Sequence, residues 1–283
     1  MRLLKVIGFI LASLFLQNIN FAVAAPLTIS ACDGNPITNT SGICSAIPDV
    51  YRMHIYKMGL CNDVGSELDS GIVPDINTKC VTTFDSGSAS VSVDIRDNIS
   101  DPVSGGTVTA PPNNLYHYGY VLIENRADIK AVKTFTSLKD GQHSGRGLVC
   151  WSIRATANSQ FSDPTTKCGN ELDTSSYGFV SSYWDNLEAD PTATPIFFSP
   201  YTEGNLDPTY AYLMNGEIIA TSTSSVNRML GFARFITPKT VDDSTSTMEV
   251  LFRVKRGLSV NQMSGNGSVG FYSYEFKTIT NLR

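Results

Sequence analysis

The feature that most constrains this chain is a two-residue alternation of apolar and polar side chains, repeated in short runs. Ala89–Arg96, Val149–Ala155 and Met248–Lys255 each show it. Successive side chains of a β-strand point to opposite faces of the sheet, so strict alternation indicates a strand with one buried face. We therefore predict a half-buried strand in each of these three segments.

Other runs are rich in β-branched and aromatic residues and are separated by clusters of Ser, Thr, Asn, Gly and Pro. Leu115–Arg126 is apolar or aromatic on both faces, which predicts a strand inside a packed layer. Further strands are expected at Tyr51–Leu60, Ile129–Thr136, Tyr177–Val180, Tyr210–Leu213, Met229–Ile236 and Gly270–Thr280. Helical periodicity is weak, and the best short candidates are Ser181–Ala189 and Asn205–Tyr212.

About ten short strands with turn signals between them predict an all-β fold, an antiparallel β-sandwich with little helix. We expect one domain over residues 25–283, with an N-terminal arm at Ala25–Ile47. Residues Pro191–Pro208 carry four prolines and no alternation. This segment is either a long loop or a seam between two β units, and we favour the loop in a single domain.

The six cysteines fall into three sequential pairs, each flanking a segment rich in turn residues. An even number of cysteines in an exported chain indicates disulfides before metal ligation, and no close Cys-x-x-Cys spacing is present. The predicted bonds are Cys32–Cys44, Cys61–Cys80 and Cys150–Cys168. Each would stabilise the fold by roughly 3 kcal/mol through loop closure.

The first 24 residues resemble a secretory signal peptide. Arg2 and Lys5 precede an apolar run, Val6–Leu16. This run is too short to span a bilayer, which needs a helix of about 20 residues. Ala22-Val23-Ala24 supplies the small residues that signal peptidase requires, so we expect cleavage after Ala24. The expected location is secreted or cell-surface, or periplasmic if the source is a diderm bacterium, with no membrane span in the mature chain.

Charge excludes one class of partner. The chain has 21 basic and 26 acidic side chains and a formal net charge of -5. A protein that binds nucleic acid needs a basic excess to neutralise phosphates, and no Lys/Arg run interleaved with aromatics is present. We therefore expect no nucleic-acid partner.

One motif resembles catalytic chemistry. Phe84-Asp85-Ser86-Gly87-Ser88 is similar to the Asp-Ser/Thr-Gly motif of aspartic proteases, and Asp69-Ser70-Gly71 lies just upstream. In such enzymes two carboxylates share a proton and activate water. In the two-lobed enzymes each motif belongs to its own lobe, whereas these two lie close together on either side of Cys80. We therefore interpret both as turns.

The histidines and acidic loops suggest no catalytic set. Gly141–Gly145 places His143 where a serine hydrolase would need the nucleophile, so that motif fails. His54 and His117 fall within predicted strands, where a half-buried, hydrogen-bonded histidine is the usual case. Calcium is the one cofactor considered, with Asp97 and Asp101 or Asp242 and Asp243 as possible ligands. Solvated turn carboxylates are the preferred interpretation, so no metal or other cofactor is expected.

Aromatic side chains indicate binding more than catalysis. Tyr183, Trp184, Asp185 and Asn186 combine two ring faces with polar groups, which suits stacking on sugar rings and hydrogen bonding to their hydroxyls. Tyr116, Tyr118 and Tyr120 would form a ladder on one strand face. Packing between layers, with the hydroxyls at the rim, is the preferred interpretation of that ladder.

Two functional hypotheses follow. The first is a secreted structural or adhesive β-protein, such as a subunit of an extracellular fibre or surface layer, which self-associates through strand edges or terminal strands. The second is a secreted module that binds or acts on surface glycans through Tyr183–Asn186. We place the first ahead, because its requirements are weaker.

Overall fold

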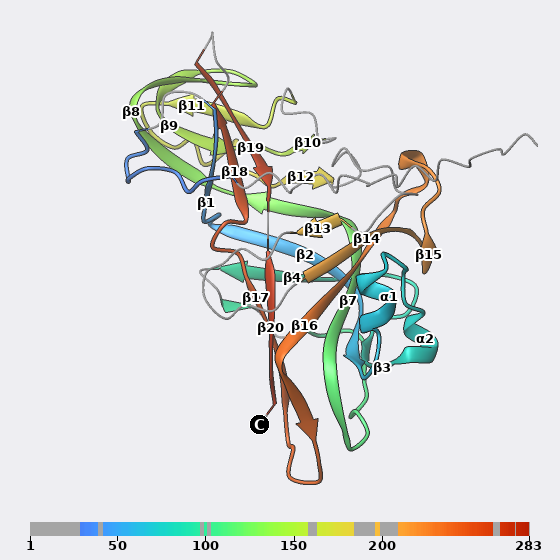
Figure 1. The fold of residues 1–283 in the computed structure, drawn as a ribbon. Coiled ribbons are helices and arrows are strands. Elements are labelled where there is room, and N and C mark those ends of the chain that lie inside the picture. The colour runs from blue at the N-terminus through green and yellow to red at the C-terminus, as the bar shows by residue number, and fades with distance from the viewer. Residues whose placement is uncertain are drawn as a thin grey trace, which may run out of the picture.

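The computed structural model describes residues 29–38, 42–96, 99–100, 103–157, 163–183, 196–198, 209–262, 267–274 and 276–282, with only the strand described at 99–100 and 196–198. The described chain is mostly strand, in curled and largely antiparallel sheets (Figure 1). The prediction of an all-β, disulfide-linked sandwich with little helix is thereby confirmed.

The larger sheet has twelve strands. They are β2 (Val50–Cys61), β3 (Cys80–Asp85), β4 (Val91–Arg96), β5 (Ile99–Ser100), β6 (Thr107–Val108), β7 (Asn114–Lys130), β10 (Ala155–Ala157), β12 (Val180–Tyr183), β13 (Ile196–Phe198), β14 (Thr209–Asn215), β15 (Ile218–Ile219) and β16 (Arg228–Val241). Its main order is β13-β14-β16-β7-β2-β3-β6, and β12 and β4 pair with β7 and β2 respectively. The long strands β2 and β7 therefore form its centre.

The smaller sheet has six strands in the order β1-β18-β19-β8-β9-β11. Their bounds are β1 (Gly42–Ala46), β8 (Val132–Gly141), β9 (Arg146–Ser152), β11 (Thr166–Gly169), β18 (Leu258–Gln262) and β19 (Ser268–Ser273). A separate antiparallel pair, β17 (Met248–Arg253) with β20 (Lys277–Leu282), completes the described strands.

Strand β7 joins the two sheets, because only Ala131 separates its end from the start of β8 (Figure 1). The sequence predicted two strands here, Leu115–Arg126 and Ile129–Thr136, with a break at the polar residues between them. That boundary is wrong: β7 continues through Asp128 because β12 pairs with Arg126–Ile129 and β2 pairs with Ala127–Lys130. Backbone pairing outweighs the local polarity of the segment.

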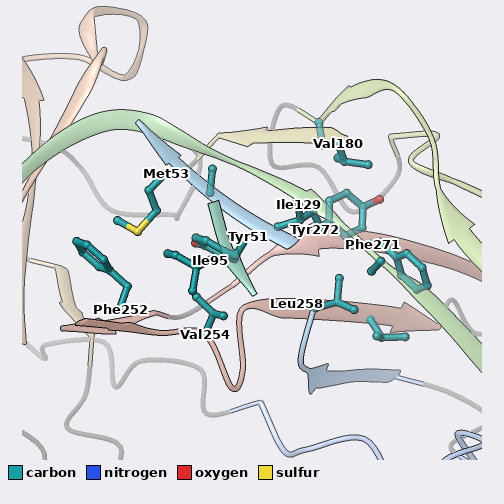
Figure 2. Packing of buried hydrophobic residues seen from close by; sticks show 14 of the residues in the cluster. Tyr51, Met53, Ile95, Ile129, Val180, Phe252, Val254, Leu258, Phe271 and Tyr272 are labelled. Atoms are coloured by element: carbon teal, nitrogen blue, oxygen red, sulfur yellow. The ribbon is translucent and has the colours of Figure 1, made fainter. Parts of the chain in front are cut away.

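The main core lies between the central part of the larger sheet and the strands of the smaller sheet and β17. Tyr51, Met53 and Ile129 face Phe252 and Phe271 across this layer (Figure 2), and all five side chains are fully buried. These five side chains come from strands of both sheets and of β17. The packed apolar layer explains why one face of β2 and β7 is apolar along its length.

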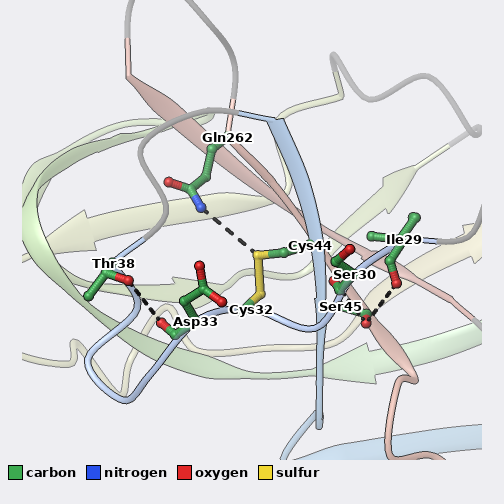
Figure 3. The surroundings of a disulfide bond; sticks show 8 residues. All are labelled: Ile29, Ser30, Cys32, Asp33, Thr38, Cys44, Ser45 and Gln262. Atoms are coloured by element: carbon green, nitrogen blue, oxygen red, sulfur yellow. Dashed lines mark hydrogen bonds between the residues drawn. A yellow bond between two sulfur atoms is a disulfide. The ribbon is translucent and has the colours of Figure 1, made fainter.

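All three predicted disulfides are present. Cys61–Cys80 joins directly opposed residues of β2 and β3, and Cys150–Cys168 does the same in β9 and β11. Cys32–Cys44 closes a loop within the N-terminal arm, where Ser45 on β1 also contacts the backbone of Ile29 and Ser30 (Figure 3). Three disulfides indicate an oxidising environment.

Helix is confined to short segments of the described chain: α1 (Gly65–Asp69), α2 (Ile76–Lys79) and the 3-10 turn η1 (Thr223–Ser225). The two weak helical candidates are strand where they can be compared, and the strand expected at Tyr210–Leu213 is present. Ser181–Tyr183 belongs to β12 and Thr209–Tyr212 to β14, since each segment pairs with a long neighbouring strand. The rest of both candidates lies outside the described residues, as does 191–208 apart from β13.

Candidate functional site

The predicted glycan site is only partly described. Tyr183 is the last residue of β12, and it lies opposite Arg126 of β7 in the strand register. Trp184, Asp185 and Asn186 lie outside the described residues. The side chains beside Tyr183 belong to β7 and to the neighbouring strand β2.

One face of β2 and β7, opposite the main core, divides into two halves. Along β7, Tyr118, Tyr120 and Leu122 belong to a second apolar cluster, and Glu124, Arg126 and Asp128 follow at the same two-residue spacing. We call the first part, with Tyr210, Tyr212, Leu230 and Phe232 of the neighbouring strands, the tyrosine half. We call the second part the charged half; its other members are Arg52, His54, Tyr56, Ser90, Ser92, Asp94, Arg96, Lys130, Tyr177, Phe179, Ser181, Tyr183 and Arg228.

The tyrosine half is covered by the segment that contains α1 and α2. The Tyr210 hydroxyl donates to Asp69 Oδ1 at 3.0 Å, and the Tyr212 hydroxyl donates to the carbonyl oxygen of Ile72 at 3.2 Å. The Tyr120 hydroxyl is 2.7 Å from Thr82 Oγ1. Burial raises the pKa of Tyr120 to about 12, so it stays neutral at physiological pH. Tyr116, Tyr118 and Tyr120, the predicted ladder, are all buried, in agreement with the packing interpretation.

The charged half begins with an arginine held in a fixed orientation. Arg52 donates from Nε to Asp94 Oδ1 at 2.6 Å and from Nη2 to Asp94 Oδ2 at 3.1 Å. Arg96 donates to the same carboxylate at 3.0 Å, and the Arg52 guanidinium lies 4.2 Å from the ring centre of Phe179. The hydrogen bond from Arg52 lowers the pKa of Asp94. Two-point pairing and stacking fix a side chain that is otherwise flexible.

Next to this pair, a histidine links a serine to an aspartate. His54 Nδ1 is 3.0 Å from Ser92 Oγ, and His54 Nε2 is 2.9 Å from Asp128 Oδ2. His54 and Asp128 are buried, at 6% and 7% exposure, whereas Ser92 is exposed. Burial opposes ionisation of Asp128, but hydrogen bonds from His54 and Ser181 outweigh it and lower its pKa. The imidazole is therefore fixed between an ionised carboxylate and a hydroxyl at the surface.

A second carboxylate is held in the same way. Glu124 accepts hydrogen bonds from Ser90 Oγ and from Arg126 Nε, the latter at 2.7 Å. Burial opposes ionisation of Glu124, but these two hydrogen bonds outweigh it and lower its pKa. The Arg126 guanidinium has two terminal nitrogens that this contact leaves unused. Ionised acceptors and cationic donors thus stand side by side on rigid strands.

Two further cations lie on aromatic rings. Lys130 Nζ is 4.0 Å from the ring centre of Tyr177, and the Arg228 guanidinium is 3.8 Å from that of Tyr56. Within the described part of the chain, neither has a carboxylate oxygen within 4.0 Å. Cation-π contact with a tyrosine places both groups without neutralising them.

The protease-like motifs are turns. Asp85 Oδ1 accepts the backbone N–H of Gly87 at 2.7 Å, and Gly87 has φ 79°, a conformation that favours glycine. Asp69 is engaged by Tyr210. The two carboxylates thus have different partners and form no dyad.

The remaining sequence candidates are separated. His143 contacts its neighbour Ser144 in an exposed turn, and His117 is exposed on β7. Asp242 accepts from Ser244 in another turn, whereas Asp97 and Asp101 lie outside the described residues. Among the described side chains, no group of three His, Cys, Asp or Glu residues is placed to hold a metal ion.

Comparison with known proteins gives no identification: no family model, no curated protein and no solved structure matches this chain. Over the described residues, the helices are all too short or too polar to cross a membrane. The function must therefore be argued from the charged half itself.

Sequence reasoning missed most of the charged half. Arg52 and His54 were visible as alternate polar positions in a predicted strand, and Glu124-Asn125-Arg126-Ala127-Asp128 shows the same alternation. That second signal was lost because it straddled the predicted break between two strands. Which strands lie beside β7 cannot be read from alternation, so the pairing of His54 with Asp128 was not predictable.

Proposed function

We propose that this chain is an exported adhesive β-protein that binds carbohydrate through the charged half, with Tyr183 as an aromatic side chain at its margin. The observation that carries the proposal is the hydrogen-bonded order of this surface. Asp94, Asp128 and Glu124 each accept hydrogen bonds from neighbouring side chains, so their positions are set before any ligand arrives. Preorganised polar groups bind with a smaller loss of side-chain entropy.

The chemistry of the surface suits sugar hydroxyls. A hydroxyl both donates and accepts, so it pairs equally well with a carboxylate and with a guanidinium. The charged half presents carboxylates and guanidinium groups on adjacent strands, such as Asp94 on β4 and Arg52 on β2. The exposed hydroxyl of Ser92 lies beside them. The Tyr183 ring, opposite Arg126, would supply an apolar surface for the C–H face of a sugar. The tyrosine half has comparable aromatic content but is covered, which supports the charged half as the binding surface.

A panel of oligosaccharides, measured by titration calorimetry against the oxidised exported chain, tests the proposal. We expect Arg126→Gln to weaken binding about tenfold or more, because a charged hydrogen bond contributes roughly 1.5–3 kcal/mol. Tyr183→Ala should weaken binding as well. Arg146→Gln is the matched control, since Arg146 also contacts a carboxylate, Asp140, but lies on the smaller sheet. No binding of any sugar by the native chain would overturn the proposal.

The N-terminal arm supports a second function, that of a subunit in an extracellular fibre or surface layer. The Cys32–Cys44 disulfide closes within the arm, which includes β1, so no disulfide joins the arm to the other strands of the smaller sheet. Strand β1 is attached there by backbone pairing with β18, from Gly42–Gln262 to Ala46–Leu258. A strand held in this way can pair instead with the β18 of another copy.

Light scattering and negative-stain microscopy over a wide concentration range test this second function. Discrete oligomers or ordered filaments would support exchange of the arm between copies. A monomer at every concentration would rule assembly out and leave carbohydrate binding as the only proposal.

A further inference from the structure

The charged half has the opposite sign to the chain as a whole. It gathers five cations, Arg52, Arg96, Arg126, Lys130 and Arg228, against the three carboxylates Asp94, Glu124 and Asp128. The complete chain has a formal net charge of -5. Two other acidic groups, Asp49 and Glu217, have partners of their own. Asp49 accepts from the Tyr177 hydroxyl at 2.6 Å, and Glu217 is ion-paired with Lys57 at 2.7 Å.

Three of these cations keep donors that no described residue uses. Arg126 contacts Glu124 through Nε, so both of its terminal nitrogens remain. Lys130 and Arg228 contact tyrosine rings and, as far as the chain is described, form no ion pair. Arg228 is near enough to Glu217 to lower the pKa of that carboxyl group, but Glu217 is bound to Lys57. Half-buried cations with unused donors, two of them with no ion pair among the described residues, favour an anionic ligand.

The geometry spaces these donors along one strand. Arg126 and Lys130 are four residues apart on β7 and point to the same face, which places their Cα atoms about 13 Å apart at ~3.3 Å per residue. Asp128 lies between them and is occupied by His54. An extended ligand with acidic groups at its two ends would reach both cations across the buried Asp128–His54 pair.

We infer that the charged half selects carbohydrate that carries carboxylate or sulfate groups, bound between Arg126 and Lys130. The inference rests on the proposed function and names its ligand class. Nucleic acid offers the same negative charge, but its long phosphate backbone would also meet the net negative surface of the rest of the chain. A short acidic oligosaccharide meets only the local excess of cations.

Two matched pairs of probes test this ligand class by calorimetry: an oligogalacturonide with its fully methyl-esterified form, and a short sulfated oligosaccharide with its unsulfated form. We expect each acidic probe to bind about tenfold or more tightly than its neutral partner, and to weaken as the salt concentration rises. Lys130→Gln should reduce affinity for the acidic probe by about threefold to tenfold, and Lys130→Arg should restore it. Lys79→Gln is the control, because Lys79 is ion-paired with Glu67 beside the tyrosine half.

The outcomes separate this inference from the proposed function. Equal binding of acidic and neutral probes, reduced alike by Arg126→Gln, keeps carbohydrate binding and overturns the ligand class. Binding of no probe in either pair, with no binding in the wider panel, overturns both. A single-stranded oligonucleotide bound as tightly as the oligogalacturonide would show a general affinity for polyanions and would also overturn the inference.

Discussion

The two halves of this sheet face differ in how their polar groups are satisfied. In the tyrosine half, hydroxyls of Tyr210 and Tyr212 reach across to the α1–α2 segment and hold it down as a cover. In the charged half, ionised side chains of the same strands contact one another, and Arg126 and Asp94 remain half-buried at the surface. Neutral groups at the rim permit burial under a cover, whereas ion pairs keep the charged half ordered with no covering segment among the described residues.

This difference teaches where binding is possible. Both halves combine aromatic rings with polar groups, so composition alone does not distinguish them. The hydroxyls of Tyr120, Tyr210 and Tyr212 have protein partners, and the aromatic rings of this half are buried, which leaves little for a ligand to contact. The charged half keeps terminal nitrogens of Arg126 and the ammonium of Lys130 at a half-buried surface.

The largest expected loss of stability comes from removing a buried phenylalanine of the tyrosine half. Phe232 is fully buried in the tyrosine half and contacts the rings of Tyr120 and Tyr212. Phe232→Ala should reduce the free energy of unfolding by about 3–5 kcal/mol, because it removes buried apolar surface and leaves a cavity. Urea denaturation followed by fluorescence measures the change.

The matched variant is Phe179→Ala, which removes the ring beneath the Arg52 guanidinium in the charged half. Phe179 is half-buried, so the expected loss is about 1 kcal/mol. Equal losses in the two variants would contradict the comparison, since they would mean that both halves are packed to the same degree.

The next largest expected effect is a loss of stability in the charged half that depends on pH. Asp128→Asn removes the ionised partner of His54 and should reduce the free energy of unfolding by about 1–3 kcal/mol at pH 7. The pKa of Asp128 is lower in the folded state than its ordinary value of 3.8, so its carboxylate stabilises the fold above that value. This contribution disappears as the pH falls through the folded pKa. The deficit of the variant should therefore shrink below about pH 4.

Urea denaturation at a series of pH values between 7 and 2 checks this dependence. Tyr120→Phe is the control, because a tyrosine hydroxyl is neutral over that whole range and its deficit should stay constant. If the stability loss of Asp128→Asn is also constant with pH, ionisation of the Asp128 carboxylate does not stabilise the folded protein.

The sequence was sufficient for the fold class and the covalent links, and the reason is local. Alternation within β4, β9 and β17 reports one buried face whichever strand lies beside it, and the cysteine pairs are close in the chain. The segments of β12 and β14 overlapped the two weak helical candidates, although Tyr210–Leu213 of β14 was also expected as a strand, because such short runs carry too little periodicity to separate the two. Their pairing with β7 and β16 decides their conformation.

The site depended on contacts that alternation does not encode. Ser92, His54 and Asp128 lie on three different strands and meet because β4 and β7 flank β2. A bulge between Met53 and Lys57 shifts the register there, so even a correct strand order would leave the pairing uncertain by a residue. Tyr183 was found because its neighbours in sequence are chemically distinctive.

The smallest effect tests the tyrosine half at the opposite end of the pH scale. Tyr120→Phe removes one hydrogen bond, to Thr82, and should reduce the free energy of unfolding by about 1 kcal/mol near pH 7. Burial raises the pKa of Tyr120 from 10.0 to about 12, so the neutral hydroxyl stabilises the fold fully below pH 10 and this contribution is lost as the pH rises toward 12. The stability loss of Tyr120→Phe should therefore shrink above pH 10, and the variant should become more stable than the native chain if the cost of ionising Tyr120 outweighs the lost hydrogen bond.

Tyr183→Phe in the charged half is the control for general effects of alkali. A deficit that stays constant from pH 8 to 12 would mean that Tyr120 is reached by water, and the tyrosine half would then be no more closed than the charged half.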